Sequence, residues 1–65
     1  MPIVEITLIE GRTDEAKRRL ISKVTDAIVE AIEAPIQSVR VILREIPAAH
    51  FGVAGKTKER PPTSG

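Results

Sequence analysis

Pro2 is the residue of this chain with the clearest capacity for chemistry, because removal of Met1 would leave its ring nitrogen as a free secondary amine. An α-amino group titrates at about 7.7 to 8, so desolvation or nearby positive charge would bring such a base close to neutrality. A base of this kind can take up and return protons at neutral pH. If Met1 is retained, the nitrogen is an amide and has no such basicity.

Two arginines and one aromatic residue are the other candidates for a functional site. Arg40 lies in an apolar strand segment, where an unpaired guanidinium is costly, so we expect a partner or a bound anion. Arg12 lies in a polar segment, and its fork of donors suits a carboxylate. Phe51 is the only aromatic residue, and a backbone N–H near Ile9 is a further possible substrate contact. Taken singly, a solvated arginine and a core phenylalanine are simpler interpretations.

Size and composition limit the class of protein. Sixty-five residues make one domain, and a chain this short buries only about 60% of its unfolded surface, which favours oligomerisation. The absence of Cys and the single His argue against disulfides and a zinc cluster, so no metal is expected. A net charge of +1 argues against nucleic acid as a partner. With neither a secretory signal nor a membrane-spanning run, we expect a cytoplasmic protein that does not bind membranes.

The hydropathy pattern predicts a strand, a helix and a second strand. Residues 3–9 and 39–46 alternate with a period of two. Between them, Thr13 is a capping residue, apolar residues recur at spacings of three and four, and Pro35 requires the helix to end by Ala34. A helical connection implies parallel strands and a right-handed crossover. The predicted fold class is therefore α/β (or α+β): a single βαβ unit with a C-terminal loop or hairpin, assembled as an oligomer.

The sheet face opposite the helix has no cover within the chain. Four isoleucines of the two strands lie on it: Ile3, Ile9, Ile42 and Ile46. Because a two-stranded sheet is not independently stable, we expect another subunit to cover this face. The domain is predicted to span residues 1–55, with a loop or tight hairpin at 47–55, and to be followed by a flexible polar tail at 56–65.

The candidate residues fall in four segments whose order along the chain is itself informative. The segments are Met1-Pro2-Ile3-Val4, Glu10-Gly11-Arg12-Thr13-Asp14-Glu15, Ser38-Val39-Arg40-Val41-Ile42 and His50-Phe51-Gly52. Together they resemble the small tautomerases typified by 4-oxalocrotonate tautomerase, over about residues 2–55. The resemblance implies a homohexamer made as a trimer of dimers. It also implies cofactor-independent isomerisation of a small unsaturated 2-hydroxy or 2-oxo acid such as 2-hydroxymuconate, in aromatic hydrocarbon catabolism.

The resemblance assigns a role to each candidate residue. Pro2 is the general base, Arg12 and Arg40 hold carboxylate and carbonyl oxygens, and Phe51 keeps the pocket apolar. Charge gathers on the 2-oxygen of the dienolate, so a guanidinium there, for which Arg40 is the candidate, stabilises the transition state. Pro2 and Arg12 flank one strand and should lie roughly 25 to 33 Å apart in one chain. A shared site therefore requires Arg12 from a neighbouring chain.

Two other functions stay open, and some residues depart from the family pattern. A haloacrylate dehalogenase, an activity found in the same superfamily, needs a carboxylate where this chain has Val53. Alternatively, the chain is a non-catalytic oligomeric module whose proline is incidental. Ala54 stands where the family often has a glycine and resists positive φ, so we expect a differently shaped loop. Arg44 has no family counterpart and is expected to be a surface or interface charge, and His50 a loop residue.

Overall fold

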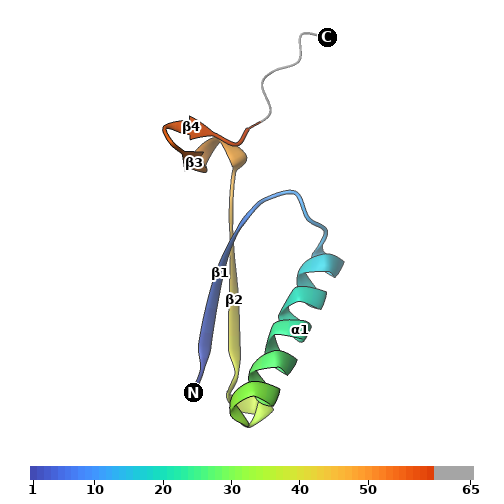
Figure 1. Cartoon of the computed structure of the whole chain (residues 1–65). Helices are drawn as coiled ribbons and strands as arrows, with labels where there is room; N and C mark the ends of the chain where they lie inside the picture. The colour runs from blue at the N-terminus through green and yellow to red at the C-terminus, as the bar shows by residue number, and fades with distance from the viewer. Residues whose placement is uncertain (60–65) are drawn as a thin grey trace.

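A computed structural model describes residues 1–59, which form a βαβ unit followed by a short hairpin (Figure 1). Strand β1 spans Ile3–Ile9, helix α1 spans Asp14–Ile32, and strand β2 spans Arg40–Ile46. A 3₁₀ turn, η1 at Ile36–Ser38, precedes β2, and a second, η2 at Ala48–His50, follows it. The predicted fold class and the predicted order of strand, helix and strand are confirmed.

Strands β1 and β2 are parallel partners over their whole length. Ile3 pairs with Arg40 where both strands begin. The ladder extends beyond each end of β1, because the N–H of Arg40 donates to the Pro2 carbonyl at 3.0 Å and the N–H of Glu10 donates to the Ile46 carbonyl at 2.9 Å. The parallel arrangement places the beginnings of both strands at one end of the sheet.

Helix α1 begins and ends where the sequence predicts. The Thr13 hydroxyl accepts a hydrogen bond from the N–H of Ala16 at 3.1 Å, which caps the first turn. Asp14 follows this cap, where the helix dipole favours negative charge. At the other end, Glu33 adopts a left-handed conformation with φ 53°, two residues before Pro35. Among residues 1–59, no helix has the length and apolar character needed to cross a bilayer.

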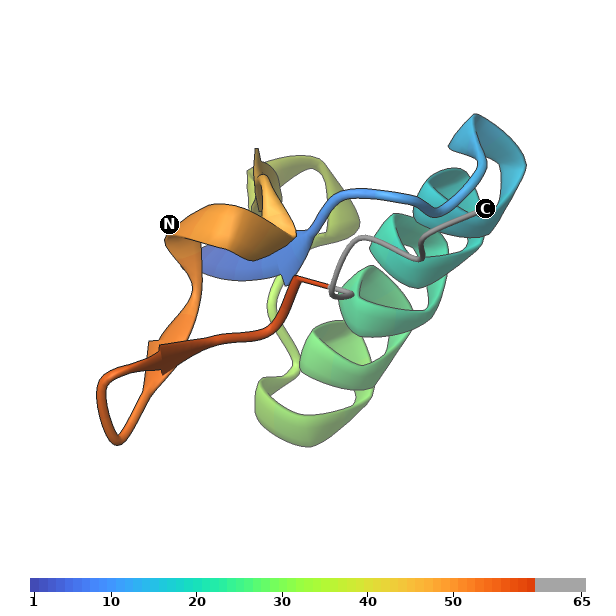
Figure 2. The ribbon, with the colours of Figure 1, turned by 90° about the horizontal axis from the view of Figure 1, so that it is seen from above.

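The helix covers one face of the sheet and leaves the other uncovered (Figure 2). In β1, Val4, Ile6 and Leu8 are half-buried beneath the helix, whereas Ile3 and Glu5 on the other face are exposed. This is the alternation that the sequence predicts.

Lys17 joins the helix to the sheet. Its Nζ atom lies 2.8 Å from Glu45 Oε1 in β2 and 3.2 Å from Asp14 Oδ1 in the first helical turn. The hydrogen bond to Glu45, followed by that to Asp14, raises the pKa of Lys17 above its ordinary value of 10.5. This contact holds the beginning of α1 against the far end of β2.

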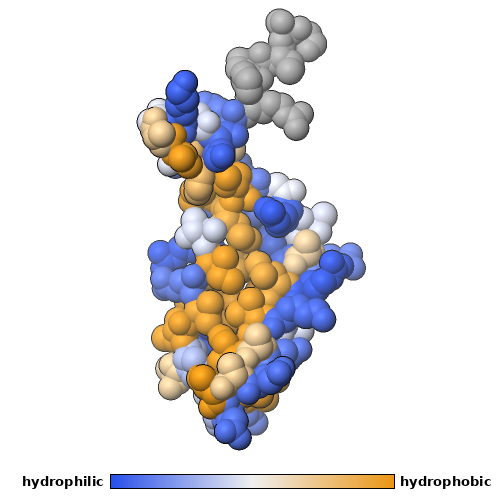
Figure 3. All heavy atoms as spheres, viewed as in Figure 1, coloured by the Kyte–Doolittle hydropathy of each residue, from blue (hydrophilic) through white to orange (hydrophobic). Residues whose placement is uncertain are grey.

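None of residues 1–59 is fully buried. Figure 3 shows a continuous apolar area running along the strands and the near side of the helix, with charged side chains along its margins. The large apolar residues that are most exposed are Met1, Ile3, Ile21, Ile32, Ile36, Ile42 and Val53. Two strands and one helix make layers that are too small to enclose a core, so the fold supports the predicted need for a neighbouring subunit.

The hairpin after β2 consists of β3 at Gly52–Val53 and β4 at Lys56–Thr57, which are antiparallel. Ala54 and Gly55 connect them with φ values of 54° and 82°. Positive φ at both central residues is the type I′ geometry that matches the twist of a two-residue hairpin. Ala54 therefore takes the left-handed conformation that alanine disfavours.

The expected start of the tail at residue 56 falls inside this hairpin, which is a correction to the sequence analysis. Lys56 and Thr57 form β4, and the N–H of Lys58 donates to the Phe51 carbonyl at 2.9 Å. This strand is polar and is held by backbone hydrogen bonds. It therefore shows no alternation of apolar and polar residues from which the sequence could predict it. The rest of the predicted tail, residues 60–65, lies outside the described residues.

Candidate active site

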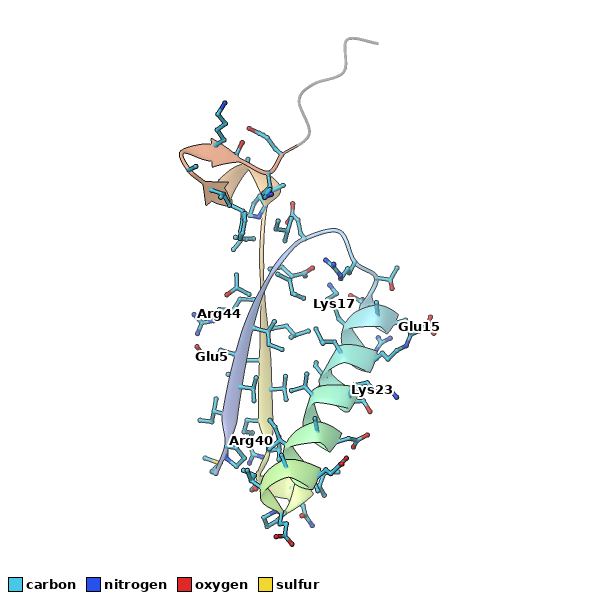
Figure 4. The ribbon with its side chains drawn as sticks, in the orientation of Figure 1. Glu5, Glu15, Lys17, Lys23, Arg40 and Arg44 are labelled. Carbon is cyan, nitrogen blue, oxygen red and sulfur yellow. The ribbon has the colours of Figure 1, made fainter. Side chains whose placement is uncertain are left out.

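The structure divides the predicted site residues between the two ends of the sheet. Pro2 and Arg40 lie where both strands begin, which we call the proline end. Ile9, Arg12 and Phe51 lie at or beyond the places where the strands finish, which we call the hairpin end. Figure 4 shows Arg40 beside the amino-terminal end of β1.

At the proline end, Pro2 is fixed through its carbonyl group alone. That carbonyl accepts the N–H of Arg40 at 3.0 Å, the first hydrogen bond of the ladder. The ring nitrogen lies beyond this bond and takes no part in the ladder. Pro2 is half-buried, whereas Met1 is 80% exposed. Strand pairing thus holds the proline ring, while the residue before it projects into solvent.

The Arg40 guanidinium donates a hydrogen bond to an uncharged partner. Its Nη1 atom donates to the Gln37 carbonyl at 2.6 Å, within the turn η1. The same turn is tightened by Ser38, whose hydroxyl donates to the Pro35 carbonyl at 2.7 Å. Within residues 1–59, no carboxylate pairs with Arg40. The expected partner is therefore a backbone carbonyl, which orients the group without neutralising its charge.

At the hairpin end, Arg12 lies in the connection between β1 and α1. Gly11 precedes it with φ 134°, a conformation that an L side chain rarely adopts, and Thr13 follows as the helix cap. The backbone around Arg12 is thus set on both sides. Its side chain is exposed and makes no hydrogen bond or ion pair with any of residues 1–59.

Phe51 is held between the turn η2 and the hairpin. Its N–H donates to the Ala48 carbonyl at 3.2 Å, and its carbonyl accepts the N–H of Lys58 at 2.9 Å. Its side chain is half-buried. Two backbone hydrogen bonds therefore fix the position of the ring at the base of the hairpin.

Ile9 is the last residue of β1 and pairs with Ile46. Successive residues of a strand direct their backbone groups to opposite edges, and the N–H of Glu10 points to β2. The N–H of Ile9 consequently points to the outer edge of β1. This orientation is compatible with the proposed backbone contact to a substrate.

The two ends are too far apart to make one site within a single chain. The seven residues of β1 span about 23 Å, beyond the reach of an arginine side chain. In one chain, residues 1–59 enclose no pocket, and no group of three or more potential metal ligands gathers among them. A site that contains Pro2 together with Arg12 or Phe51 therefore requires at least two chains.

Sequence reasoning did not identify the partners of the charged residues. The Gln37 carbonyl that orients Arg40 belongs to a 3₁₀ turn with no periodic signal. Arg44 pairs with Glu5 across the strands at 3.2 Å. The register of the parallel strands would have revealed this second pair, because Thr7 lies opposite Arg44 and Glu5 two residues before it.

Comparison with known proteins shows the family. Residues 2–60 match the family model for the tautomerase enzyme. A probable tautomerase from Ralstonia nicotianae is 59% identical over 58 residues, which cover 89% of this chain and 83% of the relative. A 2-hydroxymuconate tautomerase from Stutzerimonas stutzeri is 49% identical over 57 residues, which cover 88% and 90%.

The fold comparison agrees. The structure of a heterohexameric 4-oxalocrotonate tautomerase from Chloroflexus aurantiacus superimposes with a TM-score of 0.86 at 34% identity, covering 89% of this chain and 94% of that one. The chain belongs to the tautomerase family, and the resemblance noted in the sequence is confirmed. Its enzyme class is accordingly that of an isomerase, a tautomerase.

Proposed function

We propose that this chain, after loss of Met1, moves a proton within a small unsaturated 2-hydroxy or 2-oxo acid of the 2-hydroxymuconate type, with no cofactor. The observation that carries the proposal is the position of Pro2. Its carbonyl closes the ladder to Arg40 at 3.0 Å, so its nitrogen becomes a chain-terminal base held by a strand. The 49% identity to a 2-hydroxymuconate tautomerase supports the choice of substrate class.

In the proposed reaction, the Pro2 nitrogen removes the hydroxyl proton of a 2-hydroxy acid, or a proton from the carbon next to the carbonyl group of a 2-oxo acid. Electrons shift through the conjugated system to give a dienolate, with negative charge on the 2-oxygen. The same nitrogen then returns the proton to a carbon further along the substrate, so no proton is gained or lost overall. One recyclable base is sufficient for both steps.

The two arginines would act on the two ends of the substrate. Arg40 carries an uncompensated charge that is already oriented by Gln37, so it suits the oxygen on which charge develops. The Arg12 guanidinium donates to none of residues 1–59, so its donors are available for the distal carboxylate. Phe51 and nearby cationic groups would lower the pKa of the Pro2 amine, because both disfavour its protonated form.

The proposed functional unit is a homohexamer, built as a trimer of dimers. The division of candidates between the proline end and the hairpin end supports a site built from several chains. The exposed isoleucines of the sheet support it as well.

Replacement of the base tests this proposal directly. In protein shown by mass spectrometry to lack Met1, Pro2→Ala should lower kcat on 2-hydroxymuconate by about 100-fold or more, because a flexible primary amine replaces the ring-held secondary amine and a positioned general base contributes a factor of that size. Pro47→Ala, at the far end of β2, is the matched control and should keep the wild-type rate. Unchanged turnover of the Pro2→Ala variant, or Met1 retained on every chain in the native host, would reject the proposal.

A further inference from the structure

The connection between β1 and α1, which carries Arg12, is tied to β2 at both of its ends. At the first end, the N–H of Glu10 donates to the Ile46 carbonyl at 2.9 Å. At the second end, Lys17 Nζ donates to Glu45 Oε1 at 2.8 Å. Because Glu45 and Ile46 are neighbours in β2, these two contacts close the connection and the first helical turn into a loop at the hairpin end.

Lys17 makes the second tie by reaching from the helix to the sheet (Figure 4). Its side chain is only 20% exposed, and its Nζ atom also lies 3.2 Å from Asp14 Oδ1 in the first turn of α1. Its backbone N–H donates at 3.1 Å to the carbonyl of Thr13, the residue whose hydroxyl caps the helix. Lys17 therefore joins β2 to the helix start and to the residue that follows Arg12.

Arg12 depends on this backbone for its position. Its side chain makes no hydrogen bond or ion pair with any of residues 1–59. Gly11, which precedes it, has φ 134° and open space where a Cβ would lie, so it does little to restrict the path of the chain. A guanidinium without side-chain contacts is placed by the backbone that carries it. Movement of the connection would therefore move the guanidinium as well.

We propose that Lys17 is a positioning residue for Arg12, and that its bridge from Asp14 to Glu45 raises the affinity of the site for the distal carboxylate of a dicarboxylic substrate. This inference rests on the proposed function, which assigns that carboxylate to Arg12. Two parallel N–H groups bind a carboxylate in one geometry, and a connection that must be ordered on binding lowers the affinity. Lys17 acts through the backbone of Arg12, because both of its ion-pair partners lie within the chain.

Stabilisation of the fold is the alternative role for Lys17. A purely structural contact between helix and sheet would change ligand affinity by the same factor whether or not Arg12 is present. A positioning residue has nothing left to position once the arginine is replaced, so its effect should disappear in that background. Affinity measured with and without Arg12 therefore separates the two roles.

Adipate, a saturated dicarboxylate with no double bond to shift, reports binding apart from turnover. Isothermal titration calorimetry gives its dissociation constant for the assembled protein without Met1, as wild type, Lys17→Met, Arg12→Gln and the double variant. We expect Lys17→Met to weaken binding about 3-fold to 10-fold, and Arg12→Gln to weaken it by about 10-fold or more. The double variant Lys17→Met/Arg12→Gln should bind adipate as weakly as Arg12→Gln alone.

Two further variants serve as controls for charge. Lys23→Met removes the same charge from an exposed position of α1 and should bind adipate as the wild type does. Lys17→Arg keeps a cation between the two carboxylates and should restore most of the affinity. Sedimentation velocity checks that each variant assembles normally. If Lys17→Met does not, Glu45→Ala removes the same tie from the strand and replaces it in the comparison.

Wild-type affinity for adipate in Lys17→Met would overturn the inference, and so would an equal further loss when Lys17→Met is added to Arg12→Gln. If Arg12→Gln binds adipate as the wild type does, or the wild type does not bind it, the assignment of Arg12 is wrong and the inference falls with it. The expected adipate affinities without turnover of 2-hydroxymuconate would count against the proposed reaction only.

Discussion

Arg12 and Arg40 differ in how firmly the protein holds them before any substrate arrives. Arg40 donates to the Gln37 carbonyl at 2.6 Å, so its plane is already set. The Arg12 side chain contacts none of residues 1–59 through a hydrogen bond or ion pair. A preorganised cation stabilises developing charge most effectively, whereas a free one contributes to binding after losing side-chain freedom. The two residues should therefore have separable kinetic effects.

We predict that Arg40→Gln lowers kcat by about 100-fold to 1,000-fold, because it removes the charge that we propose stabilises the dienolate oxygen. Arg12→Gln should mainly raise KM, and only for substrates with a second carboxylate. Steady-state kinetics on 2-hydroxymuconate and on a simpler monocarboxylic enol separate the two effects. An equal loss for Arg12→Gln on both substrates would show that Arg12 does not hold the distal carboxylate.

At the scale of elements, the sequence predicts those parts that periodicity and caps define. Thr13 and Pro35 mark the limits of α1, and alternation marks β1 and β2. The strand β4 escapes prediction because two polar residues held by backbone bonds have no hydropathy period. The sequence predicts which residues form the candidate site and that they fall in two groups far apart along β1. It does not predict their hydrogen-bond partners, such as the Gln37 carbonyl, because these depend on turn geometry.

The Lys17 contact between α1 and β2 should make stability depend on alkaline pH. Because the folded-state pKa of Lys17 is raised above 10.5, its contribution is complete below pH 10.5 and is lost as the pH rises through the raised value. Lys17→Met should lower Tm at pH 8. Its Tm should also fall less steeply than that of the wild type as the pH rises above 10.5. Thermal unfolding at fixed protein concentration measures both, with Lys23→Met as the control. Identical pH profiles for wild type and Lys17→Met would contradict the prediction.

The hairpin turn carries strain that one substitution should relieve. Ala54 has φ 54°, and the left-handed conformation costs about 1 to 2 kcal/mol for a residue with a side chain. Glycine loses more chain entropy on folding, about 0.4 to 1 kcal/mol, so Ala54→Gly should raise the free energy of unfolding by about 0.5 to 1 kcal/mol. Ala31→Gly, in the exposed part of α1, should lower it by about 1 kcal/mol. Urea unfolding that gives both changes the same sign would refute this account of the turn.

At the scale of the whole molecule, each chain presents two separate groups of candidate site residues. The proline end offers Pro2, and the hairpin end, about 23 Å away along β1, offers Arg12 and Phe51. If the proposed site needs both parts, the proline of one chain works with the arginine of another. The length of β1 follows from the sequence, but which chains meet depends on contacts between subunits that no single-chain pattern encodes.

This division predicts that two impaired variants restore each other. Pro2→Ala replaces the ring-held secondary amine with a flexible primary amine, and Arg12→Gln lacks the carboxylate contact, so each alone should turn over 2-hydroxymuconate slowly at concentrations well below the KM of Arg12→Gln. When they are unfolded together and refolded at equal amounts, random assembly gives about a quarter of the sites an intact proline from one chain and an intact arginine from its neighbour. The measured rate should rise to about that fraction of the wild-type rate. Pro2→Ala refolded with the double variant Pro2→Ala/Arg12→Gln is the control and should stay inactive. A mixture no faster than the average of its two components would mean that Pro2 and Arg12 of different chains do not share a site.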